Sequence, residues 1–301
     1  MFESLLMLDQ VDAFFSLLDR YRNFRSKKPR VDSIANRFVL LFEKHGIHRN
    51  QIPRFFGHGL TLADVSDDDK LLNKLDTEIL NAASELFAVR LEWLEGVDGI
   101  IYKTHDFYKK PEAYRAFLAN IAADRERLIF AELVWSNDAR CQEDALLILK
   151  EPITEHGNQS VERYHLCSNW SSKYWKSRAD LAACIAMTEK QPHVFLKGNK
   201  TAGDITDFSQ GKRFVTDLDE LPYAYQRDWL FRKRYQPWEP DQWLYDPDAY
   251  LEGIDEGDFG KAAALSNWLA HYERGYMQTG HPRKSARMEF MAALEKYKNK
   301  G

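Results

Sequence analysis

Two neighbouring stretches of the chain carry the residue types that could do chemistry. Tyr164-His165-Leu166-Cys167 places a histidine and a cysteine two positions apart, which puts both on one face of a strand. A metal site would need two further ligands at suitable spacing, and the sequence offers no such pair. A cysteine nucleophile with His165 as its base is disfavoured, because side-by-side strand positions rarely aim at each other. We therefore expect no metal, no cofactor and no catalytic residue here.

The stretch from Asn169 to Arg178 is denser in aromatic and cationic side chains than any other. It joins an expected strand to an expected helix, and such junctions commonly line ligand pockets. Aromatic rings could stack on a planar ligand while a cation supplies charge. The candidate ligand-binding residues are Trp170, Tyr174, Trp175 and Arg178. In the alternative interpretation, the two tryptophans are core anchors of a small domain and the cations are solvated.

Sequence motifs of the common enzyme classes give no lead. Neither glycine-rich phosphate loop, GxxxxGK[ST] or GxGxxG, occurs in the chain, and neither does GxSxG or HExxH. Acidic pairs are plentiful, but without a pocket they do not indicate acid–base catalysis. An enzyme seated in residues 125–225 therefore has the least support, and we expect the protein not to be an enzyme.

Length and composition set broad limits. The 301 residues fit two domains at about 150 residues per domain. The net charge of −4 is too close to neutral to identify a partner, and 44% hydrophobic content is ample for a packed core. No apolar run reaches the roughly 18 residues that a membrane span needs, and the N-terminus lacks a basic signal-peptide region. Three scattered cysteines do not form a disulfide framework. We expect a cytoplasmic protein with no membrane partner.

The first expected secondary-structure element is an amphipathic helix over residues 1–24. Its apolar residues from Leu8 to Leu18 recur at helical spacing. Residues 20–30, RYRNFRSKKPR, end this helix and hold six basic residues and no acidic one. Pro29 marks a break, since proline disfavours helix at the residue before it.

A run of short helices is predicted next. Asp32 or Ser33 can cap the first of them, and Gly46 ends it. A second ends at Gly57 and Gly59, and the last carries an apolar stripe. The expected helices cover about 34–45, 49–56, 62–75 and 79–94.

After about residue 127 the sequence pattern changes to short runs rich in β-branched and aromatic residues. After a linker turn and a connecting helix within residues 105–127, three expected strands, a helix and a fourth strand indicate an α+β domain with a mostly antiparallel sheet. The expected strands cover 128–135, 145–150, 161–167 and 193–197, and the helix covers 178–190. Residues 222–258 predict an ordered but irregular segment. Two helices, at about 260–276 and 282–298, close the chain.

The helical region carries a recognisable pattern. Residues 37–57, RFVLLFEKHGIHRNQIPRFFG, fit a first helix, a tight turn and a second helix. Residues 75–96, LDTEILNAASELFAVRLEWLEG, fit an apolar-striped helix followed by a V-x-x-x-W-L ending. In these features residues 31–102 resemble the helix-turn-helix domain of the Cro and lambda-repressor type, often called the XRE family. The resemblance covers about 70 of the 301 residues.

The resemblance implies a bundle that presents two helices to DNA, one crossing the backbone and one entering the major groove. It implies that the start of the second helix meets a phosphate and that the start of the third helix reads base edges. The DNA-binding residues that it implies are Arg49, Asn50, Gln51, Arg54, His58 and Thr61.

Charge varies sharply along this region. Residues 31–104 hold 8 Lys and Arg against 12 Asp and Glu. Four aspartates lie where a DNA reader usually carries polar or basic side chains: Asp64, Asp67, Asp68 and Asp69. The basic segment before the bundle could instead supply an arm that follows the DNA backbone or minor groove. Alternatively, it is a solvated helix end and loop. The candidate arm residues are Arg20, Arg22, Arg25, Lys27, Lys28 and Arg30.

We expect an α+β protein with an N-terminal all-α helix-turn-helix bundle, a small, mostly antiparallel sheet domain and C-terminal helices. The expected domains are 1–30 (amphipathic helix and basic arm), 31–104 (bundle), 105–225 (α+β sensor or assembly domain) and 226–301 (Trp-rich segment and closing helices). The predicted function is a sequence-specific transcriptional regulator that binds double-stranded DNA as a homodimer, with a C-terminal domain that senses a small-molecule effector or mediates assembly. The alternative is a helix-bundle adaptor that binds a protein partner through the acidic third helix.

Overall fold

The computed structural model describes residues 33–124, 127–156, 159–220, 236–278 and 285–298, and it confirms the mixed α+β class. The helices before the sheet are α2 (Ile34–Lys44), η1 (Arg49–Gln51), α3 (Ile52–Phe56), α4 (Leu62–Val65), α5 (Asp68–Lys74), α6 (Thr77–Phe87) and α7 (Leu91–Leu94). The later helices are α8 (Pro111–Ile121), α9 (Trp175–Glu189), α10 (Thr206–Ser209), η2 (Val215–Glu220), η3 (Pro240–Leu244), α11 (Pro247–Leu251), α12 (Gly257–Glu273) and α13 (Ala286–Lys298). The strands are β1 (Thr104–Asp106), β2 (Ile129–Ser136), β3 (Ala145–His156), β4 (Gln159–Trp170), β5 (Val194–Thr201) and β6 (Gln236–Trp238).

The strands form one sheet in the order β1-β4-β3-β2-β5-β6. The consecutive strands β2, β3 and β4 pair antiparallel, and β6 pairs antiparallel with β5. Three of the five pairings are thus antiparallel, but the sheet is mixed, because β5 pairs parallel with β2 and β1 pairs parallel with β4. The parallel pairing of β5 follows from α9, a crossover helix that carries the chain back to the starting edge of β2.

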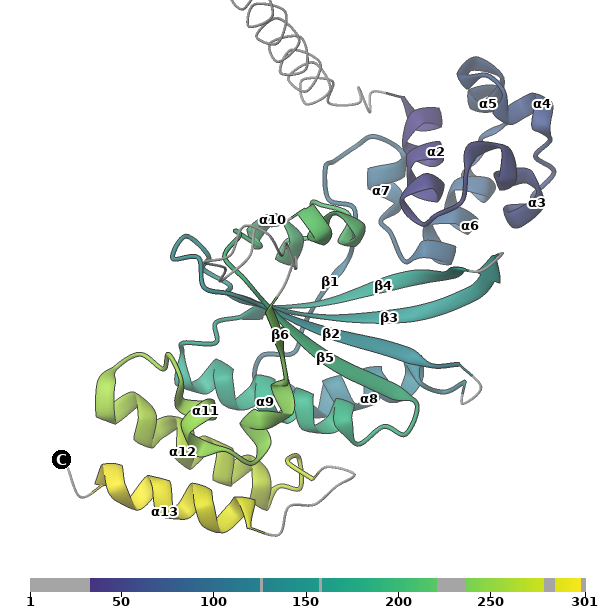
Figure 1. The fold of residues 1–301 in the computed structure, drawn as a ribbon. Coiled ribbons are helices and arrows are strands. Elements are labelled where there is room, and N and C mark those ends of the chain that lie inside the picture. Colours follow the sequence, from purple (N-terminus) through teal and green to yellow (C-terminus); the bar gives the residue numbers. More distant parts are fainter. Residues whose placement is uncertain (1–32, 125–126, 157–158, 221–235, 279–284, 299–301) are drawn as a thin grey trace, which may run out of the picture.

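Alternation along the strands divides the sheet into two apolar faces. On β2, Leu133 and Trp135 belong to a core with α8, α9, α12 and α13. Val134 lies between them in sequence and points to the opposite face, where it belongs to a second core with the helices between residues 34 and 94. Figure 1 shows these two helical groups on opposite sides of the sheet, with α12 and α13 beyond α9. The sheet is therefore the middle layer of the molecule.

Helix α9 lies at the centre of the first core. Every residue from Ser177 to Thr188 is buried, because the sheet covers one side of the helix and α12 covers the other. Short side chains such as Ala182, Ala183 and Ala186 allow this close packing. Helix α13 closes the layer, where the ring of Phe290 stacks on Trp268 at 3.7 Å.

The second core joins the helices α2 to α7 to strands β3 and β4. Phe42 of α2 meets Phe87 of α6 edge to face at 5.0 Å, and both are fully buried. Ile148 of β3 and Leu166 of β4 belong to the same cluster. The helices α2 to α7, called the α2–α7 bundle below, therefore share one continuous core with the sheet, and the expected separate all-α bundle is not supported.

Local sequence signals explain where several helices begin and end. Ser33 caps α2 through its hydroxyl, and Gly46 follows the helix with a φ of 81°. The single helix expected over 62–75 is instead two helices, α4 and α5. Asp67 interrupts it, because its carboxylate accepts the first backbone N–H groups of α5. Residues 1–32, which include the expected N-terminal helix, lie outside the described residues.

Candidate functional site

The predicted DNA-binding residues divide into three groups. The arm residues Arg20, Arg22, Arg25, Lys27, Lys28 and Arg30 lie outside the described residues. Arg49, Gln51 and Thr61 make hydrogen bonds within the bundle, and those of Gln51 and Thr61 are local to their own helix starts. Asn50, Arg54, His58 and Thr61 are exposed to solvent.

Arg49 holds η1 against the connection between α4 and α5. Its Nε donates to the carbonyl oxygen of Val65, and its Nη2 lies 2.6 Å from Oδ1 of Asp68. The side chain of Arg49 is 30% exposed. Gln51 is also engaged locally, since its Oε1 accepts the backbone N–H of His48. Both residues stabilise the bundle, and Arg49 has a carboxylate partner already.

The turn between α3 and α4 is built from glycine and histidine. Gly57, His58 and Gly59 have positive φ values of 76°, 51° and 70°, which glycine adopts without strain at the two outer positions. Helix α4 then begins with a capping box, in which Thr61 accepts the backbone N–H of Asp64 and donates its hydroxyl to that carboxylate. The Thr61 hydroxyl lowers the pKa of Asp64. A negative charge is thus held at the start of the expected reading helix.

Arg54 and His58 line a groove between the bundle and the long β3–β4 hairpin. The groove has a volume of about 460 Å³, and its walls include Phe55 and Phe56 of α3 and Ile153 of β3. The imidazole of His58 stacks on the Phe56 ring at 4.2 Å. These two candidate DNA contacts therefore flank the hairpin, while Asn50 lies exposed on η1.

The outer end of the bundle combines acidic and apolar side chains. Figure 1 shows α4 and α5 on the side of the bundle that is distant from the sheet. Leu62 is 64% exposed and Leu72 is 44% exposed. Asp67 and Asp69, at the start of α5, are also exposed.

The aromatic junction before α9 is partly core. Trp170 is fully buried, and its Nε1 donates to the carbonyl of Cys167. Arg178 is also fully buried, between the rings of Trp135 and Trp243, with the latter centred 3.9 Å from its guanidinium carbon. Its guanidinium donates to three backbone carbonyls, those of Ser172, Tyr250 and Glu252.

Arg178 therefore ties the start of α9 to the segment around α11, and burial lowers its pKa to about 10. Neither Trp170 nor Arg178 is open to a ligand. Tyr174 and Trp175 are half-buried with ring centroids 5.6 Å apart, and Trp175 lines a cavity at the start of α9. The junction thus supplies one of its predicted residues to a cavity.

His165 and Cys167 lie on β4 but do not act together. His165 Nε2 is 2.8 Å from Oε2 of Glu151, which also accepts a bidentate pair from Arg163. Cys167 is fully buried, and burial raises the pKa of its thiol far above the usual range. Within the described residues, no group of three or more His, Cys, Asp and Glu side chains is arranged to hold a metal ion.

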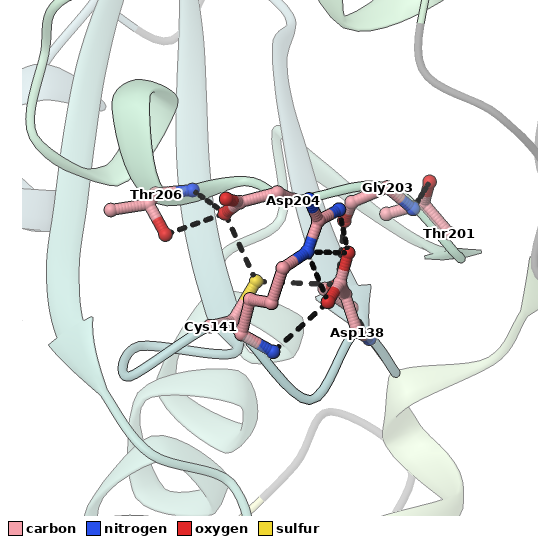
Figure 2. Close-up of polar contacts among 8 residues, drawn as sticks. Asp138, Cys141, Thr201, Gly203, Asp204 and Thr206 are labelled. Carbon is pink, nitrogen blue, oxygen red and sulfur yellow. Dashed lines mark hydrogen bonds and ion pairs between the residues drawn. The ribbon is translucent and has the colours of Figure 1, made fainter.

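A second polar cluster lies where the parallel strands β2 and β5 end (Figure 2). Cys141 Sγ is 3.5 Å from Ser136 Oγ and 3.4 Å from Oδ1 of Asp204. Asp204 also accepts the backbone N–H and hydroxyl of Thr206, and Asp138 accepts a bidentate pair from Arg140. Partial burial raises the pKa of the Cys141 thiol. A protonated thiol is a poor nucleophile. We therefore interpret the cluster as structural, because its contacts join the segment after β2 to the segment after β5.

Comparisons with protein-family models, curated proteins and solved structures found no match to this chain. Among the described residues, no helix has both the length and the apolar character needed to cross a membrane.

Proposed function

We propose that the chain is a DNA-binding transcriptional regulator of the helix-turn-helix type, with α2 to α6 as its DNA-docking module. The observation that supports this best is the placement of α3, the turn and α4. Helix α4 lies on the side of the bundle that is distant from the sheet, and Arg54 and His58 are exposed although they border the groove beside the β3–β4 hairpin. In the sequence, α2 begins at Ile34, shortly after the basic segment at residues 20–30. A helix-turn-helix module needs this exposure to enter a groove.

In this proposal the basic arm supplies most of the attraction to DNA. Neutralising phosphates releases counterions, and this term provides most of the affinity of a protein for any DNA sequence. The arm carries six positive charges, whereas Arg49 is already paired with Asp68. Asn50 and the turn at His58 then offer hydrogen-bond donors to phosphates or base edges. The arm therefore sets affinity, and the turn with α4 sets sequence preference.

The remaining parts of the proposed function are assembly and sensing. A symmetric dimer would pair two half-sites and raise the affinity, because a single small module buries little surface on DNA. Helix α13 is one candidate dimer element, since its Met288 and Met291 are 65% and 43% exposed. The region around α9 is the candidate effector domain, because Trp175 lines a cavity there.

The test is a salt titration of the full chain on labelled duplex DNA. If all six basic residues of the arm contact phosphates, a plot of log Kd against log salt concentration should have a slope of about 5. Replacing Arg22, Arg25, Lys27 and Lys28 by Ala should reduce the slope by about 3 to 4. The charge-matched control replaces Lys190, Lys261, Lys296 and Lys298 by Ala and should leave the slope unchanged. Equal slopes for the two quadruple variants would refute the role of the arm.

A second candidate function is an adaptor that binds a protein partner through α4 and α5. The exposed Leu62 and Leu72 beside Asp67 and Asp69 favour it, because such a surface complements a basic segment with an apolar face. The two functions predict opposite effects of removing the acidic charges. An adaptor loses its partner, whereas a DNA-binding module gains affinity for DNA.

A further inference from the structure

A cavity lies where three helices meet on the side of the sheet opposite the α2–α7 bundle. Its volume is about 260 Å³, and it is formed by the starts of α8 and α9 and the end of α12. The lining residues are Lys109, Pro111, Trp175, Lys176, Asp180, Asn267, His271 and Arg274. We call this the three-helix cavity. None of its residues takes part in the proposed DNA contacts.

A buried aspartate–histidine pair forms one wall of the three-helix cavity. Oδ1 of Asp180 lies 2.9 Å from Nε2 of His271, and Oδ2 accepts the backbone N–H of Lys109 at 3.0 Å. Both side chains are more than nine-tenths buried. Because the carboxylate acts as the acceptor, Nε2 of the imidazole carries the proton. Nδ1 of His271 has no hydrogen-bond partner among the described residues, which is uncommon for a buried polar atom.

Three cations surround this pair without carboxylates of their own. Lys109, Lys176 and Arg274 make no ion pair with any residue that the structure describes. The ammonium groups of Lys109 and Lys176 each lie 4.8 Å from the centre of a neighbouring aromatic ring, Tyr108 and Trp175 respectively. With Asp180 as the single carboxylate in the lining, three cations leave an excess of two positive charges. Unpaired cations around one cavity favour a bound anion.

The helix ends add to this positive potential. Pro111 and Trp175 are the first residues of α8 and α9, helices of 11 and 15 residues, and no side chain caps either start. Free N–H groups and the helix dipole make such starts attractive to anions. Helix α12 reaches the cavity with its C-terminal end. The last carbonyls there carry partial negative charge, which the nearby Arg274 and His271 offset.

We propose that the three-helix cavity binds the phosphate group of a small molecule. Lys109, Lys176 and Arg274 would neutralise the phosphate, and Trp175 would border an attached planar group. Asp180 would act as a positioning residue by fixing the His271 ring. The cavity holds a phosphate with room for only a compact remainder, since pockets for drug-sized ligands start at about 300 Å³. A neutral ligand would leave the net positive charge of the lining without a counter-charge.

This inference deepens the effector part of the proposed function but stands on different residues from the DNA contacts. Binding of phosphate without binding of DNA would support the phosphate site and contradict the regulator proposal. Binding of DNA without binding of a phosphate ligand would support the regulator and contradict the phosphate site. The two experiments therefore fail independently.

The test is isothermal titration calorimetry of the full chain in chloride buffer with three probes: inorganic phosphate, adenosine monophosphate and adenosine. Binding of both phosphate probes, with none by adenosine, is the expected result. Tighter binding of the nucleotide than of inorganic phosphate would assign the site to a phosphorylated small molecule, and the reverse order would assign it to free phosphate. Binding of adenosine as tightly as the nucleotide would overturn the proposal, as would no binding of either phosphate probe.

Variants locate the binding in the three-helix cavity. Lys176→Gln and Arg274→Gln should each raise the Kd at least about tenfold, since each removes a charged hydrogen-bond donor. Lys190→Gln, at the other end of the helix that carries Lys176, is the matched control and should leave the Kd unchanged. Circular dichroism checks that every variant is folded. The same loss in all three variants would place the binding elsewhere.

A second readout does not depend on affinity. His271 should show a change in its imidazole nitrogen chemical shifts when phosphate is added, because the anion comes to lie beside a ring with an unpartnered Nδ1. His48, exposed on the α2–α7 bundle, is the control and should not respond. A shift at His48 and none at His271 would also overturn the proposal.

Discussion

The imidazole of His45, the residue that ends α2, stacks on the ring of Tyr164 in β4, with centroids 5.4 Å apart and planes at 29°. The same imidazole lies 4.2 Å from the Phe87 ring of α6, and its Nδ1 is 2.7 Å from the carbonyl oxygen of Leu41. His45 is 7% exposed. One histidine therefore joins the α2–α7 bundle to the sheet, and burial favours the neutral form of its imidazole.

Acid should weaken this junction. Burial lowers the pKa of His45 to about 4. Between pH 6.5, the ordinary value, and pH 4, the unfolded chain takes up a proton that the folded chain does not, so the free energy of unfolding falls as the pH falls. The His45 contribution is at most about 3 kcal/mol. Urea unfolding at several pH values between 4 and 7 measures it.

His45→Asn should reduce the dependence of unfolding free energy on pH by about one proton in this range, because it removes the titrating group. His105 also has a pKa lowered to about 4, first by burial, so part of the dependence should persist. The exposed His48 provides the control, and His48→Asn should behave as wild type. An unchanged pH dependence in His45→Asn would contradict the assignment.

Arg178 should be essential for stability rather than for binding. Arg178→Met would keep apolar volume between Trp135 and Trp243 but leave three backbone carbonyls without their donors. We expect the free energy of unfolding to fall by about 3 kcal/mol or more. Lys190→Gln on the same helix should change it by less than about 0.5 kcal/mol. Equal stability of the two variants in urea unfolding would show that the guanidinium contributes no net free energy.

The cysteines should differ sharply in reactivity. Cys141 is partly exposed, whereas Cys167 and Cys184 are buried. A thiol reagent should therefore modify one cysteine in the folded protein and all three after unfolding. Because burial raises the Cys141 pKa, its rate should be below that of a free thiol at neutral pH. Cys141→Ser should abolish the reaction in the folded state, and modification of a second residue there would contradict the burial.

Much of the fold follows from local patterns. The expected strands match the cores of β2 to β5, because their side chains alternate or form continuous apolar runs. The short strands β1 and β6 were not predicted, since three residues give no period. The parallel pairing of β5 with β2 was also not predicted, because strand direction depends on the path of α9 and not on the strand sequence.

The three-helix cavity could not be predicted either, because its residues are brought together by the path of the chain and not by a local sequence pattern. Asp180 and His271 are 91 residues apart, and each alone is an ordinary helical residue. Lys109 precedes α8 and Arg274 follows α12, so no spacing in the sequence connects them. Trp175 was found because an aromatic-rich junction before a helix is a local signal. Arg178 shares that signal but lies in the core, since only the fold shows which cations have backbone partners.

Removing the acidic charges of the bundle separates the two proposed functions. Replacing Asp67, Asp68 and Asp69 by Asn keeps the helix cap, because Asn is as good an N-cap as Asp. It also frees Arg49 from its partner. The regulator proposal predicts that DNA affinity rises roughly three- to tenfold at about 0.1 M salt, where nearby charges are only partly screened.

The control for that triple variant replaces Asp255, Glu256 and Asp258, at the start of α12, by their amides and should leave DNA affinity unchanged. Equal DNA affinity of the wild type and both triple variants would count against the regulator. Loss of a protein partner in the Asp67–Asp69 variant alone would favour the adaptor.

The most direct measurement of the central proposal is fluorescence anisotropy of the full chain on labelled duplex DNA from upstream of its own coding sequence, titrated with unlabelled random duplex. The regulator proposal predicts binding that survives a large excess of random competitor and weakens steeply with salt. Binding that the competitor abolishes at stoichiometric amounts would contradict it, and the basic arm would then be a source of non-specific attraction only.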